Sequence, residues 1–215
     1  KVLRPVVTAP PGRALVELDY GQIEVGVAAA EHGDPDLTAA FNSGDVYAAM
    51  ALRFYAASLT EEERALDTSE FKRRRPDLRN RMKTFVLAVL YNIQAPHLAA
   101  QFGIPLRQAE EERERFLDLY PALKRRLEES ATFGASRGYA TVVSGLRRLV
   151  DGRVTPWVRN FLRNTPIQGS AAVVFKLAVI ALDRAFRGTH VLLVLPVHDG
   201  APGPVEKHAI PLGRP

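Results

Sequence analysis

Two aspartates stand at the ends of the two segments that most resemble buried strands. Asp19 lies near the end of the apolar run at 14–20, and Asp199 follows the apolar run at 190–197. If these strands lie side by side, the carboxylates meet at one end of the sheet and need a cation to offset their repulsion. The chain has no cysteine, and an all-oxygen site suits magnesium, two ions of which can serve phosphoryl transfer. Taken singly, either aspartate is more typical of a helix cap or a turn.

A second candidate site lies on the segment 77–93, whose pattern predicts a helix. Four of its side chains follow one another at intervals of four residues: Arg79, Lys83, Leu87 and Tyr91. Such a row stays on one face of a helix and drifts by about 40° per step. The row could hold a phosphate tail along its cations and a base beside its apolar and aromatic members. A solvated charged face would explain the cations alone, and the opposite face can supply the core: Phe85, Val86, Val89 and Leu90.

These side chains must be positioned by a mostly helical chain. About 170 residues separate the two predicted strands, so strands and helices do not alternate one by one. The pattern predicts a small sheet interrupted by a long helical insertion. The polar segment 60–76 has no clear apolar face and is expected to be exposed. Helices are expected at 22–32, 34–41, 46–57, 77–93, 96–102, 105–119, 121–137, 156–164 and 168–187, and a further strand at 139–143.

Composition and charge narrow the class of protein. Of the 215 residues, 47% are hydrophobic and 25% are charged, which excludes disordered and fibrous chains. The net charge is +5, and seven basic residues between Lys72 and Lys83 face a single acid, Asp77. This segregation indicates a polyanionic partner, although the arginine excess itself is equally well explained by a GC-rich genome.

Nothing in the sequence indicates a membrane or secreted protein. The longest apolar stretch of the second half, 171–182, is interrupted by Lys176 and is too short to span a bilayer. The first residues do not resemble a secretory signal. We therefore expect an intracellular protein without membrane association.

Four motifs of this chain resemble those of family A DNA polymerases, the DNA polymerase I group. Residues 19–24 (DYGQIE) are similar to the family's DYSQIELR motif, and the row on 77–93 to its fingers motif, R-x-x-x-K-x-x-x-[FY]-x-x-x-Y-G. Residues 164–169 (NTPIQG) resemble N-x-P-[IV]-Q-G, and 197–199 (VHD) the start of VHDE. The motifs occur in the family's order and cover most of the chain. Two further family-like segments lie between the second and third motifs: Tyr120-Pro121 and 144–148 (SGLRR).

The resemblance implies an α+β fold, an incomplete right hand with a small antiparallel palm sheet interrupted by a large helical fingers insertion. Residues 1–21 would form the first part of the palm, 22–165 the fingers and connecting helices, and 166–200 the second part of the palm. A divergent or truncated tail would follow at 201–215. No segment resembles a thumb, which predicts weak, nonprocessive DNA binding.

The resemblance also implies an activity, the template-directed addition of deoxynucleotides to a primer 3′-hydroxyl with release of pyrophosphate. Asp19 and Asp199 would be the catalytic residues and would hold two Mg²⁺ ions, assisted by the backbone carbonyl of Tyr20. The partners would be primer-template DNA and a dNTP. The enzyme is expected to be monomeric and cytoplasmic, associated with the nucleoid.

Binding roles follow from the same motifs. Arg79 and Lys83 would bind the triphosphate of the incoming dNTP. Glu24 would pack against Tyr91 and the sugar, excluding a 2′-hydroxyl. The full set of expected nucleotide-binding residues is Gln22, Ile23, Glu24, Arg79, Lys83, Leu87 and Tyr91. The expected DNA-binding residues are Arg147, Arg148, Asn164, Gln168 and His198, for which helix capping, polar packing and a solvated arginine pair are the alternatives.

The chain departs from the family's pattern in ways that bear on activity. Leu87 replaces the aromatic that stacks on the incoming base, Gly26 an arginine, Tyr47 a phosphate-binding histidine, Asn92 a glycine and Gly200 a glutamate. The proline-rich segment 201–215 cannot continue as the apolar strand that the family has there. A frame-shift or truncation after Asp199 is one hypothesis. These departures favour an alternative function, a catalytically degenerate module that binds nucleotide or DNA without turnover.

Overall fold

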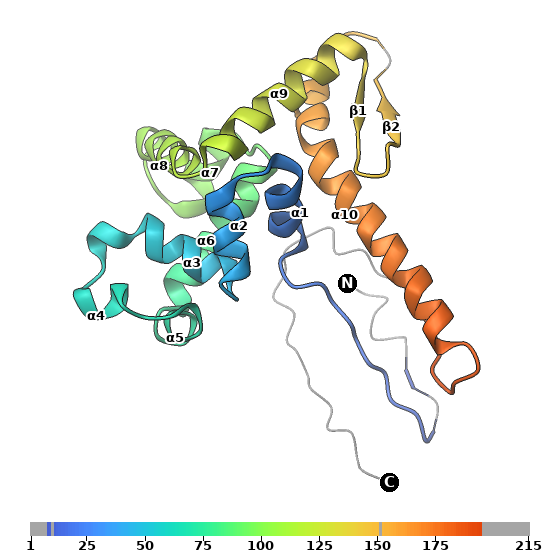
Figure 1. The fold of residues 1–215 in the computed structure, drawn as a ribbon. Coiled ribbons are helices and arrows are strands. Elements are labelled where there is room, and N and C mark those ends of the chain that lie inside the picture. Colours follow the sequence, from blue (N-terminus) through green and yellow to red (C-terminus); the bar gives the residue numbers. More distant parts are fainter. Residues whose placement is uncertain (1–7, 10, 151, 195–215) are drawn as a thin grey trace.

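The computed structural model describes residues 8, 9, 11–150 and 152–194, whose arrangement is shown in Figure 1. Helices dominate, and the sheet of the described residues pairs β1 antiparallel to β2, with Tyr139 opposite Leu149. The α+β class with a large helical block is therefore confirmed. In chain order the elements are α1 (Ile23–His32), α2 (Pro35–Asn42), α3 (Val46–Phe54), a 3-10 turn (Ala56–Ser58), α4 (Glu61–Arg64), α5 (Thr68–Arg74), α6 (Pro76–Leu90), α7 (Ala95–Phe102), α8 (Leu106–Asp118), α9 (Pro121–Arg137), β1 (Tyr139–Thr141), β2 (Arg147–Leu149) and α10 (Pro156–Phe186).

A single buried aspartate begins two of these helices. The Asp34 carboxylate accepts a hydrogen bond from the Leu37 N–H of α2 (3.0 Å) and another from the Leu123 N–H of α9 (3.0 Å). Both N–H groups belong to first turns, where no carbonyl of the same helix is available. Asp34 is fully buried, so this one side chain ties α9 to α2 across 89 positions of sequence.

The aromatic core lies where α3, α6 and α8 meet. The Phe85 ring of α6 packs against Phe54 of α3 and Phe116 of α8, with both centroid distances 5.6 Å. Tyr120 extends the cluster, 5.2 Å from Phe116. The face of α6 predicted to supply the core does so, because its four side chains are each at most 4% exposed: Phe85, Val86, Val89 and Leu90.

The segment 60–76 is more ordered than its sequence predicts. It forms α4, begun by a capping box between Thr60 and Glu63, and then α5. Phe71 of α5 is fully buried and anchors the segment against the core, while Arg73 and Arg74 are exposed. The prediction of an exposed insertion missed this anchor because one buried ring in a short helix leaves no periodic pattern.

The two helices predicted at 156–164 and 168–187 are one helix, α10, with Pro166 inside it. Proline lacks the N–H that would bond to the Leu162 carbonyl, which is why a break was expected. Packing of α10 along α9 and α1 outweighs that loss, and Leu162 is fully buried in this contact. The helix runs through position 165, where the predicted division between fingers and palm lies, and that division stays a prediction.

By length and composition alone, α10 could cross a membrane. Its most apolar 18-residue window has a mean hydropathy of 1.6, and 22% of that window is buried. The core helix of a soluble protein passes the same test, so this observation is weak. The helix is longer than the apolar stretch 171–182, whose length was the reason for expecting no membrane span.

The strands predicted at 14–20 and 190–197 are not formed in the described residues. The first segment is extended but forms no strand ladder with another described segment, and Val16 and Leu18 are 70% and 65% exposed. Residues 190–194 are likewise without strand pairing. A hydrogen bond from Arg13 Nη1 to the His190 carbonyl (3.2 Å) brings the two segments together. An apolar run becomes a strand only when a partner supplies the ladder of hydrogen bonds, and here the neighbouring segment does not.

Candidate functional site

The row of side chains at four-residue spacing lies on α6 and at its C-terminal end, as predicted. Lys83 is exposed and Arg79 is mostly buried, with 15% of its side chain accessible. Leu87 is only 8% exposed and packs toward the core instead of lying open beside the cations, and its contact with a nucleotide stays a prediction. The 40° drift per step carries the later positions of the row toward the core, and Tyr91 is half-buried.

Arg79 is held by a carboxylate from the start of α3. Its Nε and Nη2 atoms donate to Asp45 at 3.1 Å (Oδ1) and 2.9 Å (Oδ2). Lys72 Nζ lies 3.1 Å from the same carboxylate, and the Ala48 N–H donates to Oδ1 (3.0 Å), so Asp45 also caps α3. Burial would raise the pKa of Asp45, but the hydrogen bonds from Arg79, Lys72 and Ala48 outweigh it and lower the pKa.

Tyr47 completes the surroundings of Arg79. The guanidinium carbon lies 5.1 Å from the centroid of the Tyr47 ring, within cation–π range. Tyr47 is 2% exposed, and burial together with the charge of Glu24 raises its pKa well above its ordinary value. Arg79 is therefore held by a bidentate pair with Asp45 and by the nearby aromatic ring of Tyr47.

Glu24 and Tyr91 meet as the resemblance predicts. The Tyr91 hydroxyl donates to Glu24 Oε1 at 3.4 Å and so joins the first turn of α1 to the end of α6. Burial, the charge of Glu24 and this hydrogen bond raise the pKa of Tyr91 to about 12. The contact connects the first motif with the fingers motif across 67 positions of sequence.

The other residues of the first motif have structural contacts that their sequence does not reveal. Gln22 has a left-handed backbone (φ 63°), and its Oε1 accepts a hydrogen bond from the Val46 N–H at 2.7 Å. The amide of Gln22 therefore satisfies the first N–H of α3, next to the Asp45 cap. Ile23 is half-buried at the first position of α1.

The predicted metal ligands are described only in part. Asp19 and Tyr20 lie in the extended segment before α1, both exposed, with Tyr20 at 46%. Asp199 and His198 lie outside the described residues. Within the part of the chain that the structure describes, no three His, Asp or Glu side chains are grouped to hold a metal ion. The donor set that Asp19 and Asp199 would offer is all oxygen, and this chemistry fits magnesium.

The predicted DNA-binding residues are distributed over β2 and α10. The guanidinium carbon of Arg147 lies 4.6 Å from the Tyr139 ring centroid, and that of Arg148 lies 4.4 Å from the Phe161 ring centroid. Asn164 Nδ2 donates to the Tyr91 carbonyl at 3.3 Å, which ties α10 to the end of α6. Gln168 is exposed one turn further along α10.

Two departures from the family's pattern have a structural explanation. A Cβ at Gly26 would lie 2.6 Å from Cζ of Phe41, so the Phe41 ring fills the space where a side chain at position 26 would begin. Asn92 has a left-handed backbone with φ 55°, a conformation that glycine adopts freely and asparagine tolerates. Its Oδ1 accepts a hydrogen bond from Arg113 Nη2 at 2.9 Å.

Sequence reasoning missed Asp45 and Lys72 as neighbours of the candidate site. Aspartate before an apolar helical segment is a signal for a helix cap, and Asp45 has that role at the start of α3. The pairing with Arg79 spans 34 positions and could be found only from the folded chain.

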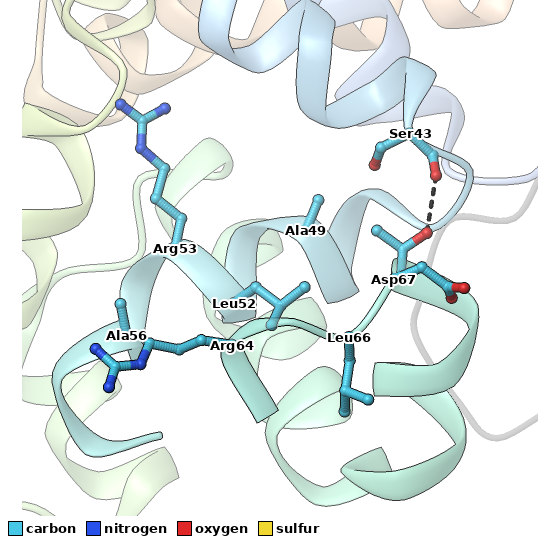
Figure 2. Close-up of a pocket in the computed structure, with 9 residues that line it drawn as sticks. Ser43, Ala49, Leu52, Arg53, Ala56, Arg64, Leu66 and Asp67 are labelled. Carbon is cyan, nitrogen blue, oxygen red and sulfur yellow. Dashed lines mark hydrogen bonds between the residues drawn. The ribbon is translucent and has the colours of Figure 1, made fainter. Parts of the chain in front are cut away.

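A separate hollow of about 600 Å³ lies between α3 and the α4–α5 segment and contains none of the predicted site residues. Figure 2 shows it, with the hydrogen bond from Thr68 Oγ1 to the Ser43 carbonyl (2.8 Å) at one side. Its lining residues are Ser43, Ala49, Leu52, Arg53, Ala56, Arg64, Leu66, Asp67 and Thr68. Arg53 is already paired with Asp36 at 3.2 Å, and the hollow is open to solvent.

Comparison with known proteins defines the class to which this fold and these motifs belong. The family model for DNA polymerase family A matches residues 1–210, and the chain belongs to that family. It is 33% identical over 205 residues to DNA polymerase I of Chloroflexus aurantiacus and 31% identical over 204 residues to the thermostable DNA polymerase I of Thermus thermophilus.

A solved structure supports the same assignment. The POL domain of Pol1 from M. smegmatis, in complex with DNA primer-template and dNTP, is similar with a TM-score of 0.65 and 29% sequence identity. The match covers 79% of this chain and 29% of that chain. The two curated relatives are matched over 92% of this chain but only 20% and 23% of their own length, so the chain spans about a fifth of them.

Proposed function

We propose that the protein carrying this chain performs template-directed DNA synthesis, adding deoxynucleotides to a primer 3′-hydroxyl with release of pyrophosphate. The observation that carries the proposal is the hydrogen bond between Glu24 of the first motif and Tyr91 of the fingers motif (3.4 Å). It supports a shared site for two motifs that are far apart in sequence. The proposed partners, primer-template DNA and a dNTP, are those named for the similar POL domain.

The triphosphate is proposed to bind along the cationic part of α6. Lys83 is exposed and has no ion pair among the described residues, so its ammonium group is available to an anion. Arg79 is oriented by Asp45 and Tyr47, and a fixed guanidinium pays little conformational entropy when it meets a phosphate. Leu87 packs toward the core, and Gln22 holds the start of α3 by accepting a hydrogen bond from the Val46 N–H. Glu24 is proposed to select the sugar.

Asp19 and Asp199, with the Tyr20 carbonyl, are the proposed holders of two Mg²⁺ ions. When bound, such ions supply positive charge to the attacking and leaving oxygens of phosphoryl transfer. Asp19 is exposed shortly before the start of α1, and Glu24 in the first turn of that helix follows five residues later. The proposal extends to a cytoplasmic, nucleoid-associated monomer.

Primer extension tests the proposal. A primed template, the four dNTPs and Mg²⁺ are incubated with the protein that carries this chain and with its Asp19→Ala and Asp199→Ala variants. We expect extension by the parent and a loss of at least about 1000-fold in both variants, since the metal-bound charge is worth several kcal/mol. Asp183→Ala, which removes an exposed carboxylate paired with Arg187, is the matched control and should extend normally. Normal extension by both aspartate variants would exclude the assignment of the metal ligands.

A second candidate function is nucleotide or DNA binding without turnover. It is favoured by Leu87, which is buried where the family has a stacking aromatic, and by the pairing of Arg79 with Asp45. Calorimetric titration with a dNTP beside the extension assay separates the candidates. Binding of the dNTP with no extension by the parent protein supports the degenerate module, and extension excludes it.

A further inference from the structure

An aromatic surface at the start of α10 has no part in the proposed chemistry. Trp157, the single tryptophan of the chain, is 74% exposed in the first turn of α10. Its ring stacks on Phe161 with a centroid distance of 5.9 Å and an interplanar angle of 18°. The guanidinium carbon of Arg148 lies 4.4 Å from the centroid of the Phe161 ring. We call these three side chains, Trp157, Phe161 and Arg148, the aromatic platform.

The platform is built from two elements that pack on each other. Register places Arg148 opposite Ala140, and Ala140 is buried at 5% where β1 packs on α10. Side chains at paired positions share a face of the sheet, so Arg148 also faces α10. Figure 1 shows the β1–β2 hairpin beside the N-terminal half of this helix. The packing of the hairpin on the helix positions the platform, while the indole itself stays in contact with solvent.

The sequence that carries the platform is rich in arginine. Between Arg137 and Asn164 the sequence has six arginines and one acid, Asp151. Arg153 is exposed in the segment before α10, and Arg159 is 50% exposed and 3.6 Å from Glu128. An exposed indole in an arginine-rich stretch of chain is complementary to a polyanion that also presents unpaired flat rings.

Single-stranded nucleic acid has this combination of features, since each base has a free π-face and each nucleotide has a phosphate. A duplex offers the same phosphates with its bases already stacked and paired. We infer that the aromatic platform binds single-stranded nucleic acid, with a base stacked on Trp157 and flanking phosphates held by Arg148 and Arg153. The inference rests on the proposed function only in taking DNA as the partner, and it adds a site for an unpaired segment of that DNA.

The position of the platform along α10 is consistent with this role. Trp157 precedes Asn164 by two helical turns, or about 10 Å at 1.5 Å per residue. Asn164 is the residue through which α10 meets the end of α6, at the Tyr91 carbonyl. A few nucleotides of single strand span that distance, so a strand near Asn164 can reach Trp157.

Tryptophan fluorescence tests the inference directly, because the single indole of the chain is the proposed contact. The full chain is titrated with oligothymidylate of about 12 nucleotides, without Mg²⁺ or dNTP, at low and moderate salt. We expect quenching of the Trp157 emission and, by anisotropy of a labelled oligonucleotide, binding that weakens about 5- to 150-fold in Trp157→Ala. Trp157→Phe, which keeps a ring, should lose less affinity. Arg148→Ala should weaken binding and reduce the slope of log affinity against log salt by about 1.

Controls separate stacking from general attraction and from misfolding. Leu177→Ala removes another exposed apolar side chain (61%) from the far half of α10 and should leave binding unchanged. Unchanged circular dichroism of Trp157→Ala is expected, because the side chain is mostly in solvent. Duplex of the same length should bind more weakly and quench less. Equal binding of duplex, or equal binding by Trp157→Ala and the parent, would overturn the inference, as would equal quenching by anionic lipid vesicles.

The outcome is independent of the polymerase proposal. A protein that does not extend primers but shows oligonucleotide quenching of Trp157 would leave the platform intact and remove only the catalytic function. A protein that extends primers but shows no quenching of Trp157 would keep the catalytic function and overturn the proposal of the aromatic platform.

Discussion

The helical block around α6 buries its apolar side chains, whereas the two apolar segments that flank the block in sequence leave theirs largely exposed. In the block, the rings of Phe54, Phe85 and Phe116 bury one another at centroid distances of 5.6–6.2 Å. In the flanking segments 14–20 and 190–194, apolar side chains such as Val16 remain largely exposed. Helices satisfy their own backbone hydrogen bonds and need only a neighbouring face, whereas strands need a partner for the backbone as well. The helical block is therefore self-sufficient, whereas the flanking segments 14–20 and 190–194 are not.

Phe116→Ala is expected to have the largest effect among the variants that test the contrast between the helical block and the flanking segments. Phe116 is fully buried at the centre of the aromatic core, and loss of such a ring leaves a cavity that costs about 3–5 kcal/mol of unfolding free energy. Urea unfolding followed by circular dichroism measures the loss. A cost below about 1 kcal/mol would mean that the block is not a close-packed core, and the contrast with the flanking segments would fail.

Asp45→Asn tests whether the candidate site is part of that self-sufficient block. The substitution removes the charge that holds Arg79 and Lys72, and removal of one partner from a largely buried pair costs about 3 kcal/mol. Lys72→Ala, which removes the more exposed partner (56%), is the control and should cost less than about 1 kcal/mol. Equal costs for the two variants would contradict the arrangement in which Asp45 and Arg79 form the central pair.

The same carboxylate predicts a pH dependence of stability. The folded-state pKa of Asp45 is lowered, so its stabilising contribution is complete above the unfolded value near 4 and is lost as the pH falls through the folded value. Asp45→Asn should therefore lose less stability than the parent below about pH 4. Burial and the charge of Arg126 lower the pKa of His32 from 6.5 to about 4. Because of His32, the free energy of unfolding of both proteins therefore also falls as the pH is lowered from about 6.5 to about 4. A parallel decline of the two proteins below pH 4 would contradict the prediction.

Tyr91→Phe should have a smaller effect, about 0.5–1.5 kcal/mol, because it removes one hydrogen bond and leaves the ring. Glu24→Gln should lower the pKa of Tyr91 from about 12 by removing the neighbouring charge. Ultraviolet difference titration of Glu24→Gln, with Glu24→Gln/Tyr91→Phe as the reference, isolates that tyrosine. A Tyr91 pKa that does not change would mean that α1 and α6 are not coupled through this pair.

Val16→Ser should have the smallest effect, within about 0.5 kcal/mol, because the side chain is already 70% exposed. The same urea unfolding experiment applies, with Val25→Ser as the buried counterpart in the adjacent helix α1. A large loss for Val16→Ser would show that the flanking segment packs in solution and would remove the contrast between the two regions.

Several elements could be predicted because their cause is local. Proline at the first helical position and aspartate just before it mark the start of α2, and the buried face of α6 follows from periodicity. The spacing of Arg79, Lys83, Leu87 and Tyr91 likewise identified the helix that carries the candidate site. The continuous path of α10 through Pro166 could not be predicted in this way, because contacts with α9 and α1 stabilise it.

The sequence by itself determined the family, the order of the motifs and the helical face on which the cations lie, since these depend on residue type and spacing along one chain. Only the tertiary structure decided that Asp45 pairs with Arg79, that Tyr91 reaches Glu24 and that Leu87 is buried. These contacts join residues 34 or more positions apart, or depend on which neighbour covers a side chain. The physical reason is that spacing fixes direction within an element, while the partner that meets a side chain is chosen by the packing of all elements together.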